Sequence, residues 1–198
     1  MKRADPEAIF MSITQNHLPG AGGSLVHPHL QVHATKQIST NHALLQTRAR
    51  EHAARYGTCI LADLLLAEQE IGERYIGSTG AWEWIAAYAP SGFYEIWGIA
   101  AAESSLLIPE KKNIWQDLAE GVLNTQKFYK SLNRNAYNLC LLSIEDAAKY
   151  PCLKISLTAR SSYAPWVRSD FTGFELASGE MATFTLPESV AAMAGKFW

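Results

Sequence analysis

Long hydrophobic runs are missing from this sequence. The longest apolar stretch covers residues 60–67, is interrupted by Asp63, and is far too short to cross a bilayer. Residues 1–10 contain several charged side chains and no apolar segment long enough for an export signal. The sequence therefore predicts a cytoplasmic protein with no membrane partner.

The sequence also has few cysteines and a small net charge. The three cysteines, Cys59, Cys140 and Cys152, are far apart and form no CxxC pair, which argues against a disulfide framework and a thiolate metal clip. The net charge is −2, so no basic field recruits nucleic acid. Any bound phosphate must be held locally, by backbone amides and a few side chains.

Histidine is absent from residues 53–198. All six histidines, His17, His27, His29, His33, His42 and His52, lie in the first 52 residues, so any imidazole chemistry must come from this part of the chain. We expect His17, His42 and His52 to be solvated. The pattern leaves open whether His33 faces a site.

Hydrophobic residues make up 48% of the chain, enough to bury a core. Strands are predicted at residues 8–15, 29–35, 74–80, 82–89, 93–100, 137–144, 153–160, 173–178 and 182–186, and helices at 42–56, 60–71, 111–132 and 187–195. On the helix at 60–71 the expected apolar stripe is Ile60, Leu64, Ala67 and Ile71. This order predicts an α+β fold, a mainly antiparallel sheet with packed helices.

Residues 16–31, NHLPGAGGSLVHPHLQ, combine a glycine-rich loop with two closely spaced histidines. Glycines let backbone N–H groups approach a phosphate without interference from a Cβ atom. On a strand, residues i and i+2 share a face, so His27, His29 and Gln31 are expected to point the same way. The segment therefore predicts a nucleotide site.

Transfer of a nucleotidyl group through a covalent intermediate needs a neutral nucleophile and donors for the phosphate oxygens. His29 is the candidate nucleophile, and Gly22, Gly23, Ser24 and Gln31 are the candidate phosphate contacts. The neutral amide of Gln31 cannot readily serve as a general acid for a leaving alcohol. This favours transfer of the nucleotide to another phosphate over hydrolysis.

The pattern N-x5-G-x-S-x2-HPH-x-Q, formed by Asn16, Gly22, Ser24, His27, His29 and Gln31, resembles the signature of the galactose-1-phosphate uridylyltransferase family in the histidine-triad superfamily. The segments around GERYIGSTG and GFELASGE agree in order with that family. The resemblance implies histidine-triad-like halves, one partial and one complete. Residues 1–71 would be a partial first half with the HPHxQ motif, and residues 72–198 a second half without the histidines.

The same resemblance assigns roles to individual residues. It implies that His29 carries the uridylyl group, that His27 is a zinc ligand, and that Asn16, Gly22, Ser24 and Gln31 contact the nucleotide phosphate. Phe174 and Glu175 would reach the hexose-phosphate site of a partner subunit in a dimer. Arg168 stands near the place where some members carry a basic residue for the sugar phosphate.

The sequence departs from the family at its metal sites. His27 is the one matched zinc ligand, so a tetrahedral zinc site cannot close from this chain. Some members bind another metal through two histidines, and the corresponding positions here are Lys154 and Ser156. We therefore expect zinc to be incomplete or absent and the second metal to be absent.

The leading functional hypothesis is a ping-pong nucleotidyltransferase of galactose metabolism, which moves UMP between a nucleotide sugar and a hexose 1-phosphate. One alternative is an adenine-nucleotide-sugar phosphorylase, and another is a truncated, non-catalytic nucleotide-binding remnant. The chain begins just before the HPHxQ signature, so strands 8–15 and 29–35 are expected to leave sheet edges uncovered. A homodimer, or association with a separate N-terminal half, is the expected consequence.

Overall fold

The computed structural model describes residues 10–24, 27–100, 113–144, 152–160 and 172–198. Its elements in chain order are β1 (Phe10–His17), η1 (Pro19–Ala21), β2 (Gln31–Thr35), α1 (Thr40–Tyr56), α2 (Ile60–Ile71), β3 (Tyr75–Thr79), β4 (Trp82–Ala86), β5 (Phe93–Ala100), α3 (Ile114–Ser131), β6 (Ala136–Ile144), β7 (Cys152–Arg160), α4 (Gly173–Ser178), α5 (Pro187–Ala194) and η2 (Gly195–Phe197). No helix in these ranges combines the length and apolar composition that crossing a membrane requires.

The strands form one seven-stranded sheet in the order β2-β1-β6-β7-β5-β4-β3, and every neighbouring pair is antiparallel. This confirms the predicted α+β fold. The expectation that residues 8–15 form an open edge is wrong, because β1 pairs with β2 on one side and with β6 on the other. Within the described residues β2 is the outer strand, as predicted for residues 29–35.

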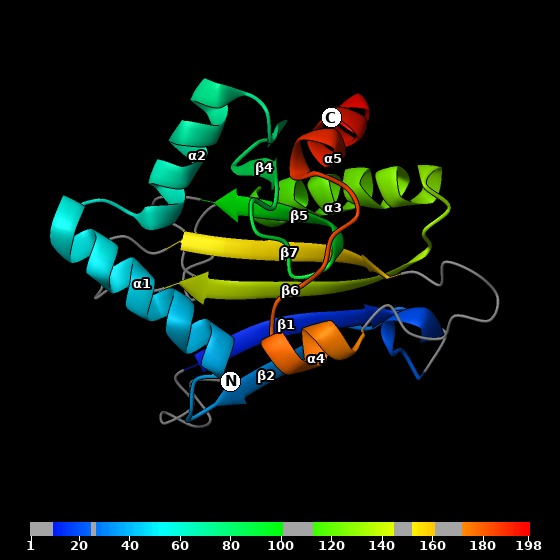
Figure 1. Ribbon diagram of the computed structural model, residues 1–198, viewed down its shortest axis with the longest axis horizontal. Coiled ribbons are helices and arrows are strands. Elements are labelled where there is room, and N and C mark those ends of the chain that lie inside the picture. Colours follow the sequence, from blue (N-terminus) through cyan, green and yellow to red (C-terminus); the bar gives the residue numbers. More distant parts are fainter. Residues whose placement is uncertain (1–9, 25–26, 101–112, 145–151, 161–171) are drawn as a thin grey trace.

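One face of the sheet packs on α3 and α5 (Figure 1). Trp82 and Trp84 are fully buried there, and the indole N–H of Trp84 donates to Thr79 Oγ1 at 2.8 Å. The backbone of Gly121 on α3 lies directly against the Trp84 ring, which leaves no room for a side chain. Each large apolar side chain buried in this layer stabilises the fold by about 1.5–3 kcal/mol.

Helices α1 and α2 cover part of the opposite face, where Leu61 and Leu65 pack on Ile85 and Ile99. The α2 bounds match the prediction, but the buried face is displaced by one residue, to Leu61, Leu65 and Glu68, while Ala67 and Ile71 are exposed. Glu68 is fully buried because its Oε1 accepts a 2.9 Å hydrogen bond from Arg74 Nε. A pattern of apolar residues does not predict a buried ion pair.

The rest of that face is polar. The pairs Thr14–Gln31, Ser12–His33, Asn16–Asn138 and Cys140–Ser156 are directly opposite one another, and residues two apart on a strand share a face. We call this surface the polar face; it carries Ser12, Thr14, Asn16, Gln31, His33, Asn138, Cys140, Lys154, Ser156 and Thr158.

Two predicted strands near the C-terminus are wrong. Residues 173–178 form helix α4, because Thr172 and Glu175 make a reciprocal capping box at its start. Residues 182–186 are in no strand, and Thr183 Oγ1 there donates to the Thr185 carbonyl at 3.0 Å. The helix predicted at 187–195 is confirmed as α5.

Candidate active site

The HPH segment lies just before β2, which begins at Gln31, two residues later than predicted. The half-buried His29 places Nδ1 3.2 Å from the main-chain oxygen of His27, and the two imidazole centroids are 5.5 Å apart. A carbonyl oxygen only accepts, so this bond requires the proton on Nδ1. In the neutral ring the lone pair is then on Nε2. This contact fits the tautomer that attack on phosphorus requires.

Gln31 and His33 follow on the polar face. Gln31 lies opposite Thr14 and is exposed. His33 lies opposite Ser12, and its Nε2 is 3.2 Å from Thr14 Oγ1. The sequence left open whether His33 faces the site. In the structure His33 lies on the same face of the sheet as Gln31.

The glycine-rich loop connects the end of β1 to the HPH segment. The N–H groups of Ala21 and Gly23 donate to the Leu18 carbonyl and that of Gly22 to the Pro19 carbonyl, each at 3.0 Å. These three amides are engaged within the loop, and the predicted role of Gly22 and Gly23 as phosphate contacts stays a prediction. Ser24 is exposed, and its hydroxyl donor role stays a prediction.

Gly23 has a packing role that the sequence did not reveal. A Cβ atom there would lie 2.8 Å from the Asn16 carbonyl oxygen and 2.9 Å from that of Leu18. Gly22 has φ of +83°, a conformation that favours glycine, and open space around it. The two glycines therefore shape the loop against β1.

Asn16 is fixed by a chain of hydrogen bonds across three strands. Asn138 Nδ2 donates to Asn16 Oδ1 at 2.7 Å and to the Ala21 carbonyl at 2.9 Å, while Arg160 Nη1 donates to Asn138 Oδ1 at 2.9 Å. The Asn16 amide oxygen is thus occupied, and its NH₂ group is what can donate to a phosphate. Sequence reasoning missed Asn138 and Arg160; the one signal was polar residues at alternate positions of two otherwise apolar strands.

Within the described residues, no contact brings Phe174 or Glu175 together with the HPH segment. Arg168 lies outside the described residues. Phe174 is exposed on α4, whereas Glu175 is buried and accepts hydrogen bonds from the Thr172 hydroxyl, the Thr172 amide and the Ala182 amide. The Thr172 hydroxyl is the main reason that the pKa of Glu175 is lowered. Their sugar-phosphate role stays a prediction.

His27 is the candidate zinc ligand, and it is exposed beside His29. In the part of the chain that the structure describes, no group of three or more His, Cys, Asp or Glu side chains could share a metal ion. A tetrahedral zinc site needs four ligands, so the described residues do not fit one.

None of the three histidines expected to be solvated is fully exposed. His42 is buried and donates from Nε2 to the Ser143 carbonyl at 2.8 Å. His52 is partly buried and contacts Asp63 Oδ2 at 2.7 Å, because α1 and α2 meet at this corner. His17 is half-buried and stacks on Tyr137, with ring centroids 4.7 Å apart.

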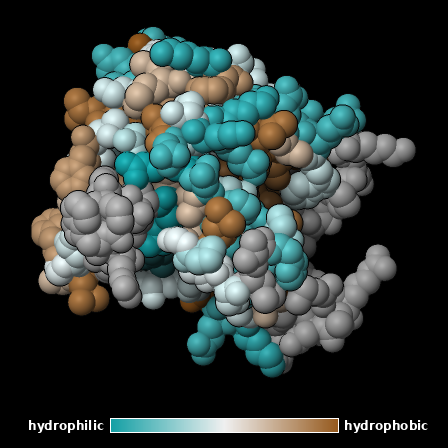
Figure 2. All heavy atoms as spheres, turned by 90° about the vertical axis from the view of Figure 1, so that its right-hand side faces the viewer, coloured by the Kyte–Doolittle hydropathy of each residue, from teal (hydrophilic) through white to brown (hydrophobic). Residues whose placement is uncertain are grey.

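Figure 2 shows the end of the molecule at which β1 runs into η1. On the surface that is not drawn in grey, hydrophilic residues lie beside hydrophobic ones. In the glycine-rich loop and the HPH segment, Ser24 and His27 are exposed.

Sequence comparison finds a relative in an archaeon. The chain is 29% identical over 199 residues to an uncharacterized protein from Archaeoglobus fulgidus, covering all of this chain and 59% of that protein. No known family profile matches the sequence. The chain thus spans less than two thirds of the length of this relative.

Solved structures share the fold at low sequence identity. An ADP-glucose phosphorylase from Arabidopsis thaliana, with bound ADP-glucose, has a TM-score of 0.78 at 20% identity, over 98% of this chain and 63% of that one. A uridylyltransferase structure has a TM-score of 0.80 at 18% identity, over 98% and 62%. The chain therefore has the fold found in these two enzymes.

Proposed function

We propose that this chain is a nucleotidyltransferase that moves UMP between a nucleotide sugar and a hexose 1-phosphate through a covalent intermediate on His29. The observation that carries the proposal is the 3.2 Å hydrogen bond from His29 Nδ1 to the His27 carbonyl, which directs the lone pair to Nε2. The fold shared with an ADP-glucose phosphorylase and a uridylyltransferase supports the same reaction class.

In the first step Nε2 of His29 bonds to the α-phosphorus of the nucleotide sugar. The bond from that phosphorus to the bridging oxygen breaks, and hexose 1-phosphate leaves with the electron pair. The ring, now substituted on Nε2 and protonated on Nδ1, is cationic, and the His27 carbonyl stabilises it through the same hydrogen bond. In the second step an oxygen of another hexose 1-phosphate attacks phosphorus, and the N–P bond breaks.

Gln31 fits transfer better than hydrolysis. It lies opposite Thr14 on the polar face, two residues after His29, and its amide donates hydrogen bonds but does not protonate a leaving group. A departing phosphate oxygen is a weak base and needs no general acid. Asn16, fixed through Asn138, is the second amide assigned to the phosphate.

A second candidate is an adenine-nucleotide-sugar phosphorylase, in which inorganic phosphate takes the group from His29. The structure with bound ADP-glucose favours including it, because its TM-score nearly equals that of the uridylyltransferase. The same assay separates the two, since it offers UDP-glucose and ADP-glucose in parallel.

The test is covalent labelling. The chain is incubated with UDP-glucose or ADP-glucose labelled at the α-phosphate, then exposed to acid or base and digested for mass spectrometry. We expect an acid-labile, base-stable nucleotidyl group on His29, absent in His29→Asn and retained in the control His52→Asn, a histidine in the corner between α1 and α2. A folded protein that takes no label from either sugar is a non-catalytic remnant, and the proposal is then wrong.

The predicted dimer and the predicted separate N-terminal half are part of this proposal. β2 is the outer strand among the described residues, so its free edge is available for strand pairing. Labelling is therefore measured across protein concentrations, beside analytical ultracentrifugation. A monomer at micromolar concentration contradicts the homodimer without deciding the chemistry.

A further inference from the structure

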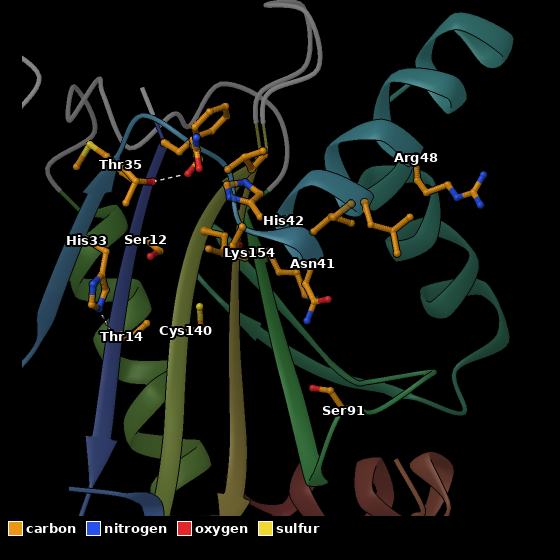
Figure 3. A pocket seen from close by; sticks show the side chains of 18 of the residues that line it. Ser12, Thr14, His33, Thr35, Asn41, His42, Arg48, Ser91, Cys140 and Lys154 are labelled. Atoms are coloured by element: carbon orange, nitrogen blue, oxygen red, sulfur yellow. Dashed lines mark hydrogen bonds between the residues drawn. The ribbon is translucent and has the colours of Figure 1, made fainter. Parts of the chain in front are cut away.

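A cavity of about 1380 Å³ lies on the polar face, beside α1 and toward the N-terminal end of β1. Strands β1, β2, β5, β6 and β7 contribute to its lining, and α1 forms a wall (Figure 3). Phe10, Leu44 and Leu142 give it apolar surfaces, while Ser12 and Asn41 give it polar ones. Its volume exceeds what inorganic phosphate alone needs and is larger than the roughly 300–1,000 Å³ of ordinary pockets for organic ligands, so an organic molecule has room in it.

The negative charge on the described lining already has hydrogen-bond donors. Glu95 is its one carboxylate, and it is 4% exposed. Its Oε2 accepts from the Ser91 backbone N–H and from the Ser91 hydroxyl at 2.9 Å, and its Oε1 accepts from the Trp97 indole at 2.6 Å. These bonds leave the carboxylate turned toward its own strand and turn.

Positive charge, in contrast, is left over. Lys154 places Nζ 3.4 Å from the centroid of the Trp97 ring, and no carboxylate in the described part of the chain forms an ion pair with it. Arg48, also on the lining, pairs with Glu51 at 2.8 Å and points away from the cavity in Figure 3. The described lining thus has three cations, Lys36, Arg48 and Lys154, and Lys154 is the one that lies on strand β7 over the Trp97 ring.

Burial lowers the pKa of Lys154, because a desolvated ammonium is unfavourable, and the attraction of the Glu95 carboxylate offsets this lowering only in part. Cys140 supplies no full counter-ion, because burial raises the pKa of its thiol. The ring of Trp97 compensates the ammonium only in part. An anion entering the cavity would complete the missing half of this interaction.

We propose that the cavity binds a phosphorylated organic molecule, with its phosphate on Lys154 and its organic part against Phe10, Leu44 and Leu142. Asn41, whose amide points into the cavity in Figure 3, supplies a second donor. Lys154 is separate from the HPH segment, because β7 is the third strand from β2 and strand spacing alone puts them about 14 Å apart. The cavity reaches β2 at His33 and Thr35, and its described lining does not include His27 or His29. The proposal stands whether or not His29 is a nucleophile.

The first test is calorimetric titration of the full chain with glucose 1-phosphate, AMP, inorganic phosphate and glucose at millimolar concentration. We expect saturable binding of at least one of the two phosphorylated organic probes, and none of glucose. Lys154→Met keeps the packing on Trp97 and should weaken that binding about 10- to 100-fold, the effect of losing a charged hydrogen bond. Lys196→Met, an exposed lysine on η2, should leave it unchanged.

Other outcomes overturn the proposal. Binding that is kept in folded Lys154→Met but lost in His29→Asn would place the anion at the HPH segment. If inorganic phosphate binds as tightly as the organic probes, the proposed organic ligand is wrong. If the wild-type protein binds none of the probes, the proposed site is wrong. Loss of His29 labelling alone affects only the proposed function.

A second measurement needs no variant. Acetylation of lysines is followed by mass spectrometry with and without the probe that binds. A bound phosphate keeps the Lys154 ammonium protonated, so we expect Lys154 to be protected by the probe while Lys196 is not. Equal acetylation of Lys154 at saturating probe would contradict the proposal even if Lys154→Met did not fold.

Discussion

Asn138→Ala is the substitution that tests most directly how the fold supports His29. It removes both hydrogen bonds that Asn138 donates, to Asn16 and to the Ala21 carbonyl, and the one that it accepts from Arg160. The change leaves the HPH segment untouched in sequence. Any effect on His29 must therefore pass through the position of Asn16 and of the glycine-rich loop.

The magnitude follows from the three bonds. A neutral hydrogen bond contributes about 0.5–1.5 kcal/mol and one from a charged donor about 1.5–3 kcal/mol. Asn138 is half-buried, so water replaces part of what is lost. We expect the free energy of unfolding to fall by about 2–3 kcal/mol. Labelling of His29 should slow at least about tenfold, since small displacements of positioning groups have large effects on rate.

Urea denaturation gives the free energy of unfolding, and the α-phosphate label gives the rate. Asn138→Asp is the informative companion, because its carboxylate still accepts from Arg160 but cannot donate to Asn16 or Ala21. It should slow labelling as much as Asn138→Ala while costing less stability. Asn135→Ala, an exposed asparagine just before β6, is the matched control. A labelling rate in Asn138→Ala equal to that of the wild type would refute the positioning role.

Three further predictions concern stability, each measured by urea denaturation. Arg74→Met strips a fully buried carboxylate of its ion-pair partner and should cost about 3 kcal/mol. Gly121→Ala would put Cβ 1.9 Å from the Trp84 ring and should cost about 3 kcal/mol, whereas Gly173→Ala, with open space, should cost little. A hydrogen bond from the Thr58 hydroxyl is the main cause of the lowered pKa of Asp63, so its contribution is present above the ordinary value of 3.8 and is lost as pH falls through the lowered pKa. The stability difference between wild type and Asp63→Asn should therefore shrink below about pH 4, and a constant difference from pH 7 to pH 3 would contradict this.

Local signals in the sequence predicted most elements. Helix α2 begins and ends where expected, because Gly72 adopts a left-handed conformation as its C-cap, with φ of +76°. A capping signal also marks α4. Thr172 and Glu175 have the T-x-x-E spacing of a capping box, which favours a helix over the strand predicted from residues 173–178.

The burial of polar residues explains why the expected exposure of His42 on α1 is wrong. Its buried positions are His42, Gln46 and Ala49, which follow the helical period but include two polar side chains. His42 is tolerated there because it donates to the Ser143 carbonyl, more than 100 positions later in the chain. An apolar pattern cannot identify such a face, since the partner that makes burial favourable is set by the tertiary fold.

One part of the candidate site can be predicted from residues close in sequence, and the other part depends on the tertiary fold. His27, His29 and Gln31 are close in sequence, so their residue types and spacing were sufficient to predict a nucleophile and its amide neighbour. Asn138 and Arg160 are brought to Asn16 only by the register of β6 with β1 and β7, in which Asn138 lies opposite both Asn16 and Thr158. A register shift of one residue would turn Asn138 to the other face of the sheet. The proposed nucleophile is therefore predicted from neighbouring residues, whereas the position of Asn16 depends on long-range strand pairing. For this reason the Asn138 variants and the His29 variant test different parts of the proposed site.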